Sequence, residues 1–346
     1  MKTMIAMAGQ MGCSDIHISE GLPLMFRLNG QLIPAPVQPD ASECREMILN
    51  CMDSGLRKQF DAGRDVDFAM QLSGFRERVN VFRYMGKIAA TVRLLNSRIP
   101  ALKELGLPTI LEQLAAEPRG LILVTGPTGS GKSTTLASMI DTINEKRSEH
   151  ILTVEDPVEY VYTPKQATIH QREVGRDVED FAGALRSALR EDPDIILVGE
   201  MRDYETISAA VTAAETGHLV LSTLHTTGAA QTIDRIIDAC PAAAQNQIRT
   251  QLSGIVRGVI TQCLIPNSSG TGRVPATEIL IGSEAVLNLI RENKCHQLGT
   301  VMQSGMAQGM HTLNADLNRL YRSGQISREN ALKYSNNRKE LEEYVL

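Results

Sequence analysis

The stretch Leu121-Ile-Leu-Val-Thr-Gly-Pro-Thr-Gly-Ser-Gly-Lys-Ser-Thr134 decides the fold of this chain. Its first four residues form a continuous apolar run, as expected for a strand that is buried on both faces. The rest fits the pattern G-x-x-x-x-G-K-[ST], and residues 134–144 continue as a helical stretch. A buried strand, a glycine-rich loop and a helix in this order predict a nucleotide-binding P-loop.

The residue types in this loop follow from phosphate chemistry. Glycines allow consecutive backbone N–H groups to curl around phosphate oxygens, and the N-terminus of the following helix adds a positive dipole. We expect Lys132 to reach the β- and γ-phosphates and the Ser133 hydroxyl to bind Mg²⁺, so the expected cofactors are ATP and Mg²⁺. The expected nucleotide-binding residues are Gly126, Thr128, Gly129, Ser130, Gly131, Lys132, Ser133 and Thr134.

Beyond the loop, apolar runs alternate with helical segments. Strand-like runs occupy residues 151–154, 195–198 and 219–224, and helical patterns occupy 181–189 and 203–216. This alternation predicts an α/β fold with a mostly parallel sheet. From about residue 245 the sequence looks helical, with a short extended piece at 276–281.

Acidic residues follow two of these strands. Glu200 ends the run Asp194-Ile-Ile-Leu-Val-Gly-Glu200, a pattern typical of a Walker B strand whose acid holds Mg²⁺ directly or through water. Glu155-Asp-Pro-Val-Glu159 follows the strand after the P-loop helix, and such carboxylates can order Mg²⁺ and polarise an attacking water. A solvated acidic turn is the alternative interpretation of this second group. We favour a functional role because ligands bind at the carboxyl edge of a parallel sheet.

Two histidines flank the run at 219–224. His225 lies at the end of this strand, where a sensor of the γ-phosphate would lie. His218 lies at the start of the strand, and a single histidine at such a position is more often structural.

The first hundred residues have a different pattern. Alternating strands are expected within 14–34 and 66–95, with a hairpin turn at Asn29-Gly30 and one helix over 40–60. We therefore expect a small α+β domain over residues 1–100, a proline-containing linker over 101–118 and the ATPase domain over 119–346.

Charge is distributed unevenly along the chain. Residues 76–98 hold six Lys and Arg against the single acid Glu77, whereas the whole chain has a net charge of −5. The basic stretch fits either a solvated sheet face or a surface that meets an anion. The negative net charge and the absence of Trp argue against a nucleic-acid motor, which would need a basic and often aromatic track. No run of 18 apolar residues occurs, so no membrane-spanning helix is expected.

Taken in order, the P-loop, the acidic box, the Gly199-Glu200 pair and the two-histidine box resemble those of the secretion ATPase superfamily. Further stretches are similar to the retraction ATPases of type IV pili in particular. These stretches are Cys13-Ser-Asp-Ile-His-Ile-Ser19, Gly21-Leu-Pro23, Gln171-Arg-Glu-Val-Gly175, residues 184–201 and Ile326-Ser-Arg-Glu-Asn330. The resemblance spans essentially the whole chain.

The resemblance implies a homohexameric motor that hydrolyses ATP and powers pilus retraction and twitching motility. Each subunit would have a PAS-like N-terminal domain and a RecA-like ATPase domain, with ATP bound between them and closed over by the neighbouring subunit. The motor would act on an inner-membrane pilus platform protein from the cytoplasmic face of the inner membrane, and no nucleic-acid partner is implied.

The resemblance also implies roles for individual residues. Glu159 would be the general base, Glu200 would lie on the Mg²⁺ side together with Ser133 and Glu155, and His225 would sense the γ-phosphate. Arg78 and Arg93 would reach the phosphates held by an adjacent subunit, which favours the anion-facing interpretation of the basic stretch.

One departure concerns the retraction motif. The family's Ala-Ile-Arg-Asn-Leu-Ile occurs here as Ala285-Val-Leu-Asn-Leu-Ile290, with Leu287 in place of the arginine. Pilus-assembly and type II secretion ATPases remain the alternatives. They usually carry a four-cysteine zinc motif, and no C-x-x-C pair occurs in this chain.

Overall fold

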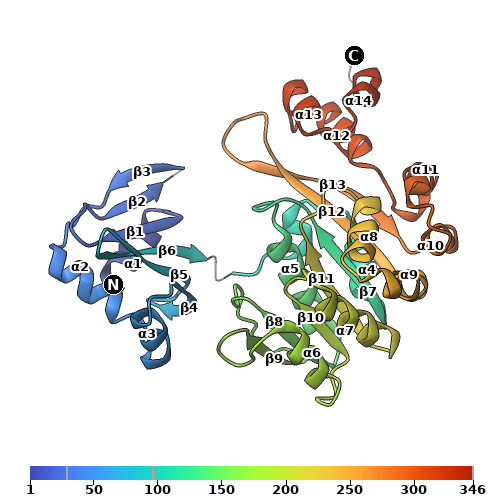
Figure 1. Cartoon of the computed structure of the whole chain (residues 1–346). Coiled ribbons are helices and arrows are strands. Elements are labelled where there is room, and N and C mark those ends of the chain that lie inside the picture. Colours follow the sequence, from blue (N-terminus) through green and yellow to red (C-terminus); the bar gives the residue numbers. More distant parts are fainter. Residues whose placement is uncertain (29, 96–97, 345–346) are drawn as a thin grey trace. The chain divides into compact units, whose positions relative to one another are not determined.

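The computed structural model describes residues 1–28, 30–95 and 98–344 and divides into two compact units. The N-terminal unit comprises Met1–Arg98 together with Pro157–Val161, and the C-terminal unit comprises Ile99–Asp156 and Tyr162–Leu346 (Figure 1). The chain thus passes from one unit to the other three times. A short piece of sequence from the ATPase half, which contains Glu159, packs with the N-terminal unit.

The N-terminal unit is built on a six-stranded antiparallel sheet in the order β3-β2-β1-β6-β5-β4. Its strands are β1 (Asp15–Ser19), β2 (Met25–Leu28), β3 (Gln31–Pro34), β4 (Val66–Leu72), β5 (Phe75–Tyr84) and β6 (Lys87–Leu95). Its helices are α1 (Lys2–Gln10), α2 (Ala41–Leu49) and α3 (Ser54–Asp61). Alternate strand residues such as Ile16, Val79 and Val92 are fully buried, and they pack with Ile5 of α1 and Ile48 of α2 in one core. The opposite face of the sheet carries the polar residues of the same strands.

The strand predictions for this unit are confirmed, but the single helix expected over 40–60 is wrong. Asp40 caps α2 by accepting a hydrogen bond from the Glu43 backbone. Asp53 then caps a separate helix, α3, by accepting from Gly55 and Leu56, and this second cap sets a new helix axis. The predicted hairpin exists, because Leu28 pairs with Gln31, but Asn29 lies outside the described residues.

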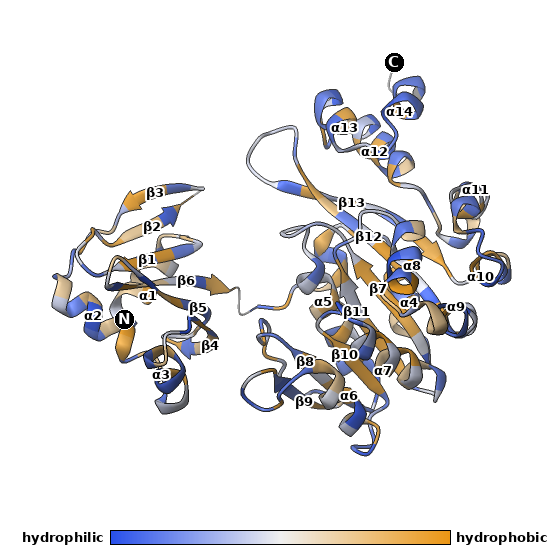
Figure 2. Ribbon diagram, viewed as in Figure 1, coloured by the Kyte–Doolittle hydropathy of each residue, from blue (hydrophilic) through white to orange (hydrophobic). Residues whose placement is uncertain are grey.

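A seven-stranded sheet in the order β13-β12-β7-β11-β10-β8-β9 forms the centre of the C-terminal unit. All neighbouring strands run parallel except β12 and β13. The strands are β7 (Gly120–Thr125), β8 (His150–Glu155), β9 (Thr168–Glu173), β10 (Ile195–Val198), β11 (Leu219–Leu224), β12 (Val256–Pro266) and β13 (Arg273–Ile281). The central strands are the most apolar part of the unit, as Figure 2 shows.

Helices cover the sheet and extend the unit at its C-terminal end. They are η1 (Leu102–Leu105), α4 (Ile110–Ala115), α5 (Lys132–Lys146), α6 (Phe181–Ala188), α7 (Tyr204–Glu215), α8 (Ala229–Asp238), α9 (Ala242–Ile255), α10 (Glu284–Arg291), η2 (Cys295–Gln297), α11 (Leu298–Ser304), η3 (Met306–Gln308), α12 (Leu313–Arg322), α13 (Arg328–Tyr334) and α14 (Arg338–Tyr344). The main core joins alternate strand residues such as Leu121 and Val220 to α6–α10. A separate small core joins α12–α14 to the ends of β12 and β13.

The region after residue 245 was predicted to be helical, and this prediction is wrong for β12. Helix α9 runs directly into this strand of 11 residues, since Ile255 ends the helix and Val256 begins the strand. No proline marks the transition from helix to strand, so the local sequence gives no clear sign that the helix ends here. β12 forms because it pairs with β7 on one side and β13 on the other, which is a long-range contact. β9 was not predicted either.

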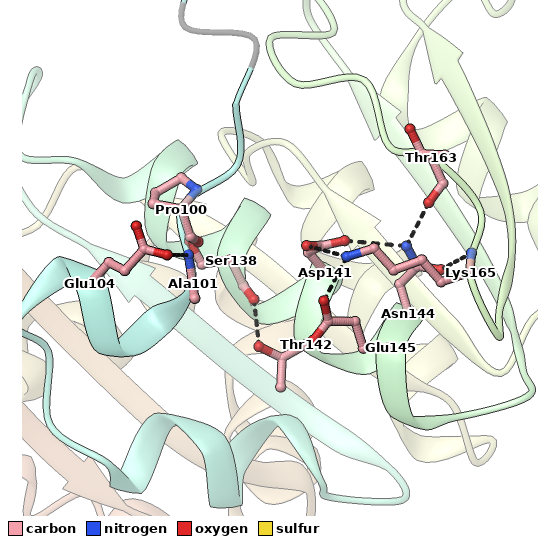
Figure 3. Close-up of polar contacts among 10 residues, drawn as sticks. All are labelled: Pro100, Ala101, Glu104, Ser138, Asp141, Thr142, Asn144, Glu145, Thr163 and Lys165. Carbon is pink, nitrogen blue, oxygen red and sulfur yellow. Dashed lines mark hydrogen bonds and ion pairs between the residues drawn. The ribbon is translucent and has the colours of Figure 1, made fainter.

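The P-loop helix α5 anchors both chain segments that lead into the C-terminal unit (Figure 3). The Ser138 hydroxyl donates to the carbonyl of Pro100 at 2.7 Å, close to the first crossing. The Asn144 side chain donates to the Thr163 carbonyl at 2.9 Å and accepts from the Lys165 backbone at 2.9 Å, close to the last crossing. The ammonium of Lys165 also contacts the carboxylates of Asp141 and Glu145.

Candidate nucleotide-binding site

The glycine-rich loop joins β7 to α5, as predicted. Gly126, Gly129 and Gly131 have φ values of 141°, 77° and 92°, which L side chains rarely adopt. Space is restricted as well: a Cβ on Gly131 would lie 2.9 Å from the side-chain nitrogen of Gln262. The backbone of the loop therefore needs glycine for both its dihedral angles and its packing.

Lys132 lies at the start of α5 and is 9% exposed. Its ammonium donates to the carbonyl oxygens of Gly126 and Pro127 at 2.9 Å and 3.1 Å, so the side chain folds back over the loop. Ser133, by contrast, is exposed. The structure therefore brings the cationic Lys132 and the exposed Ser133 to the same end of the helix, next to the loop, as a phosphate site requires.

The predicted strand-end residues meet at the same edge of the sheet. β11 lies next to β7, with Leu224 opposite Thr125, and β10 lies next to β11. Because these strands are parallel, their carboxyl ends lie along the edge that carries the P-loop. His225 follows β11 and Glu200 follows β10, and the two side chains approach to 3.7 Å between Nε2 and Oε2.

Several contacts hold Glu200 in place. The hydroxyls of Ser222 and Thr223 on β11 donate to the carbonyls of Val198 and Gly199, which fixes the end of β10. Arg202 forms an ion pair with the Glu200 carboxylate at 2.6 Å. The Glu200 side chain is only 14% exposed, whereas that of His225 is 53% exposed, so the acid is fixed and the imidazole remains accessible.

Glu155 ends β8, the strand beside β10. One of its oxygens accepts from the Thr153 hydroxyl at 2.6 Å and from the Gln171 amide at 3.2 Å. These two hydrogen bonds orient the Glu155 carboxylate at the end of the strand.

A cavity of about 470 Å³ lies beside Glu200, at the N-terminal ends of α6 and α7. Asp180 and Asp203 are the N-cap residues of these two helices, and both line it. Its other charged lining residues are Asp156, Glu179, Arg186, Arg202 and Glu205. The excess of carboxylates distinguishes this cavity from the cationic P-loop, so phosphate is expected at the loop and not here.

Glu159 belongs to the segment Pro157–Val161, which packs with the N-terminal unit. The Arg76 guanidinium on β5 donates to the backbone carbonyl of Val158 at 3.1 Å and holds this segment against the strand. Glu159 is half-buried. The structure thus assigns the expected base to a different unit from the P-loop, Glu155, Glu200 and His225.

Arg78 and Arg93 are direct partners across β5 and β6, on the polar face of the N-terminal sheet. Arg78 forms an ion pair with Asp67 at 2.8 Å, and Arg93 forms one with Asp15 at 2.9 Å. Burial opposes ionisation of Asp15, but hydrogen bonds from Ser14 and Arg93 outweigh it and lower the pKa of this carboxyl. The Arg93 side chain nevertheless remains 62% exposed, so it can take part in further contacts.

His218 lies at the amino end of β11, opposite the edge with the P-loop. Its Nδ1 atom lies 2.8 Å from the Ala213 carbonyl near the end of α7. This contact supports the structural interpretation of His218 rather than a place beside His225.

The family model of type II/IV secretion system proteins matches residues 1–344. The chain belongs to this family. It is 48% identical over 330 residues to the type IV pilus retraction ATPase PilT of Pseudomonas aeruginosa, covering 95% of this chain and 96% of that protein. It is 49% identical over 316 residues to a twitching motility protein of Neisseria gonorrhoeae, covering 90% of this chain and 84% of that protein.

Solved structures agree with this membership of the type II/IV secretion system protein family. The crystal structure of the pilus retraction motor PilT with bound ADP has a TM-score of 0.92 and 46% identity, covering 99% of each chain. The ATPase DotB of Legionella pneumophila has a TM-score of 0.83 and 31% identity, covering 95% of this chain and 93% of that one. The α/β fold is therefore that of the secretion ATPases.

One residue at the site of this family member escaped the sequence analysis. Gln262 on β12 is 3% exposed, and its side chain bonds to Ser130 in the loop and to Thr135 in α5. The expectation of a helix over this region hid it, because a glutamine on a helix carries no signal for this site. A strand prediction would have placed it beside β7.

Proposed function

We propose that this protein is an ATP-hydrolysing motor that powers type IV pilus retraction and hence twitching motility. One observation carries the proposal. A P-loop and the Glu200–His225 pair share one sheet edge in a chain that aligns with 96% of the length of a pilus retraction ATPase. Type II secretion and pilus assembly are the alternative tasks for a motor of this family.

The residues of this chain divide the chemistry as follows. The loop N–H groups and Lys132 bind the phosphates, and this requires the ammonium to exchange its contacts with Gly126 and Pro127 for phosphate oxygens. Glu159 acts as the general base that accepts a proton from the attacking water. His225 contacts the γ-phosphate, and its proximity to Glu200 couples this contact to the end of β10.

Mg²⁺ is the second cofactor of this proposal. The donors that we assign to it are Ser133 Oγ, Glu155 and, through water, Glu200, and all are the hard oxygen ligands that Mg²⁺ prefers. When bound, the ion neutralises charge on the β- and γ-phosphates. The ion pair with Arg202 holds the Glu200 carboxylate in one orientation.

The assembly in this proposal is a homohexamer in which Arg78 and Arg93 of one subunit stabilise charge on the nucleotide held by the next. Their cross-strand pairing on an exposed face supports this role, because both guanidinium groups lie on one side of the sheet. We also assign residues 1–100 to a PAS-like domain, 101–118 to a linker and 119–346 to a RecA-like ATPase domain. An antiparallel sheet with its helices packed in one core supports the first assignment.

No helix in the described part of the chain is long and apolar enough to cross a membrane. On the likeness to pilus motors, we place the protein at the cytoplasmic face of the inner membrane, acting on a pilus platform protein there. The ring turns this platform as hydrolysis changes the conformation of each subunit.

Deletion of the gene tests whether the motor acts in pilus retraction, pilus assembly or secretion. For a retraction motor, pili accumulate on the cell surface and twitching stops, and wild-type protein reverses both effects whereas Lys132→Ala does not. Loss of surface pili would instead assign the protein to pilus assembly, and normal pili with a secretion defect would assign it to secretion.

A further inference from the structure

We infer that Gln262 is a positioning residue of the nucleotide site, whose buried carboxamide holds the glycine-rich loop in its phosphate-binding curvature. The inference rests on the proposed function, since it assumes that this loop binds the nucleotide. It adds a residue from a strand that lies outside the motifs of the site.

The position of Gln262 follows from strand pairing. β12 runs parallel to β7, and Thr261 lies opposite Thr125, the last residue before the loop. The backbone pairing sets the register of the two strands, and the hydroxyls of these two threonines also bond to each other at 2.8 Å. Gln262 is the next residue along β12, and its side chain consequently lies under the loop.

The carboxamide of Gln262 joins two points of the site. Its Nε2 atom donates to the Ser130 carbonyl at 2.6 Å, and its Oε1 atom accepts from the Thr135 hydroxyl at 2.9 Å. Ser130 precedes Lys132 and Thr135 follows it, so one side chain spans the residues on both sides of the phosphate-binding lysine. Both partners are buried, at 3% and 1% exposure, and water cannot replace the lost bonds without rearrangement.

Close packing gives Gln262 a second role. A Cβ on Gly126 would clash with the backbone carbonyl oxygen of Gln262. A Cβ on Gly131 would lie 2.9 Å from its Nε2 atom. Two glycines of the loop motif therefore rest directly on this residue. Contact with Gln262 therefore helps to fix the conformation of the loop, in addition to the dihedral angles of the loop itself.

The carboxamide of glutamine offers a donor and an acceptor from one planar group. Gln262→Glu keeps the acceptor for Thr135 but turns an oxygen towards the Ser130 carbonyl. Gln262→Met keeps the length and removes both bonds, and Thr135→Val removes only the bond to Oε1. These three substitutions separate the two halves of the contact.

The experiment measures ADP binding, steady-state ATPase kinetics and thermal unfolding of the full chain. We expect Gln262→Met to raise the Kd for ADP and the KM for ATP by about tenfold or more, since buried partners are left unpaired. We expect Gln262→Glu to raise the Kd for ADP and the KM for ATP by a similar factor, and Thr135→Val to raise both constants by a smaller factor. In Gln262→Met, Thr135→Val should add little, because the bond it removes is already lost.

Thr261→Val is the matched control. It also removes one buried hydrogen bond next to the loop, but the lost partner is Thr125 on the neighbouring strand. We expect it to lower the unfolding temperature about as much as Thr135→Val while the Kd for ADP stays within about twofold of the wild type. Equal effects of Thr261→Val and Thr135→Val on the Kd would reduce Gln262 to a general stabilising residue and overturn the inference.

Lys132→Ala separates this inference from the proposed function. If Lys132→Ala loses ADP binding while Gln262→Met and Thr135→Val bind ADP like the wild type, the inference about Gln262 is wrong and the nucleotide site stands. If Lys132→Ala binds ADP like the wild type, the assignment of the nucleotide site itself is wrong. Should Gln262→Met fail to fold, Thr135→Val still decides the question, because wild-type affinity in that variant contradicts the inference.

Discussion

At the scale of single residues, Glu77 lies in a buried apolar environment, although the stretch of sequence around it is strongly charged. It is the one acid of the basic stretch, yet it shares the apolar face of β5 with Val79 and Val81 and is fully buried. Neither carboxylate oxygen has a hydrogen-bond partner among the described residues. Burial raises the pKa of Glu77 to about 7, although the Leu72 backbone and the charge of Arg76 act in the opposite direction.

Glu77 therefore makes the stability of the protein fall as pH rises. The pKa of Glu77 is higher in the folded state than in the unfolded state. Below the unfolded pKa the acid is protonated in both states and does not affect stability. As the pH rises from there to about 7, the folded state is progressively destabilised relative to the unfolded state. We expect Glu77→Leu to be more stable than the wild type at pH 8.5 by about 3 kcal/mol, because a pKa raised from 4.5 to about 7 corresponds to a free energy of this size. At pH 4.5 the gap should narrow strongly. A gap that is equal at both values would contradict a buried titrating carboxyl.

At the scale of elements, α5 connects the P-loop to the two segments that lead from the N-terminal unit into the C-terminal unit. Asn144 is fully buried and fixes residues 163–167 through its side chain and its own carbonyl, which accepts from Gln166 at 2.8 Å. Burial opposes the charged form of Lys165, but hydrogen bonds to Asp141 and Glu145 and their negative charges outweigh it and raise the pKa of the Lys165 ammonium. One helix thus carries phosphate contacts at its start and segment contacts at its end.

Asn144→Ala tests this second role of α5. Loss of its bonds to Thr163 and Lys165 leaves two backbone groups without partners, and we expect a destabilisation of about 1–3 kcal/mol in urea unfolding. Hydrogen exchange of the Lys165 and Gln166 amides should accelerate. Thr142→Val is the control, since the hydroxyl of Thr142 bonds only to its own helix, at the Ser138 carbonyl. Matching exchange rates in the two variants would show that the anchor is dispensable.

At the scale of the whole molecule, the expected catalytic residues are divided between the two units. The P-loop, Glu155, Glu200 and His225 belong to the C-terminal unit, whereas Arg78, Arg93 and Glu159 belong to the N-terminal unit. Motion of a unit as a body would move its set of residues together. This division is what a motor needs if nucleotide chemistry is to be linked to changes in conformation.

Two inactive variants, when mixed, test the role of Arg93 between subunits. Arg93→Ala should bind ATP normally and hydrolyse it at least tenfold more slowly, and Lys132→Ala should lose binding. If the two variants mix randomly in the proposed hexamer, a wild-type Lys132 meets a wild-type Arg93 of its neighbour at about a quarter of the sites, and activity should return to that extent. If the mixture stays inactive after subunit exchange, Arg93 acts within its own subunit.

Glu159→Gln gives a further test of the assignment of roles. This substitution keeps the shape of the side chain and removes its basicity, so hydrolysis should fall by about 10²-fold or more while the Kd for ATP stays near the wild-type value. A wild-type rate would show that another group accepts the proton from water.

The amino-acid sequence by itself determined the features that depend on short spacing. The P-loop, the buried parallel strands and the placement of Glu200 and His225 at strand ends all follow from residues that are close together in the chain. Local propensity and periodicity dominate there. The α/β fold class was for this reason predictable.

Only the tertiary structure decided the rest. β12 exists because β7 and β13 pair with it, and Gln262 reaches the loop through that pairing across more than a hundred residues. Burial of Glu77 and the packing of Glu159 with the N-terminal unit likewise depend on neighbours that are distant in sequence. Long-range contacts supply the energy that overrides local preference, and no local pattern encodes them.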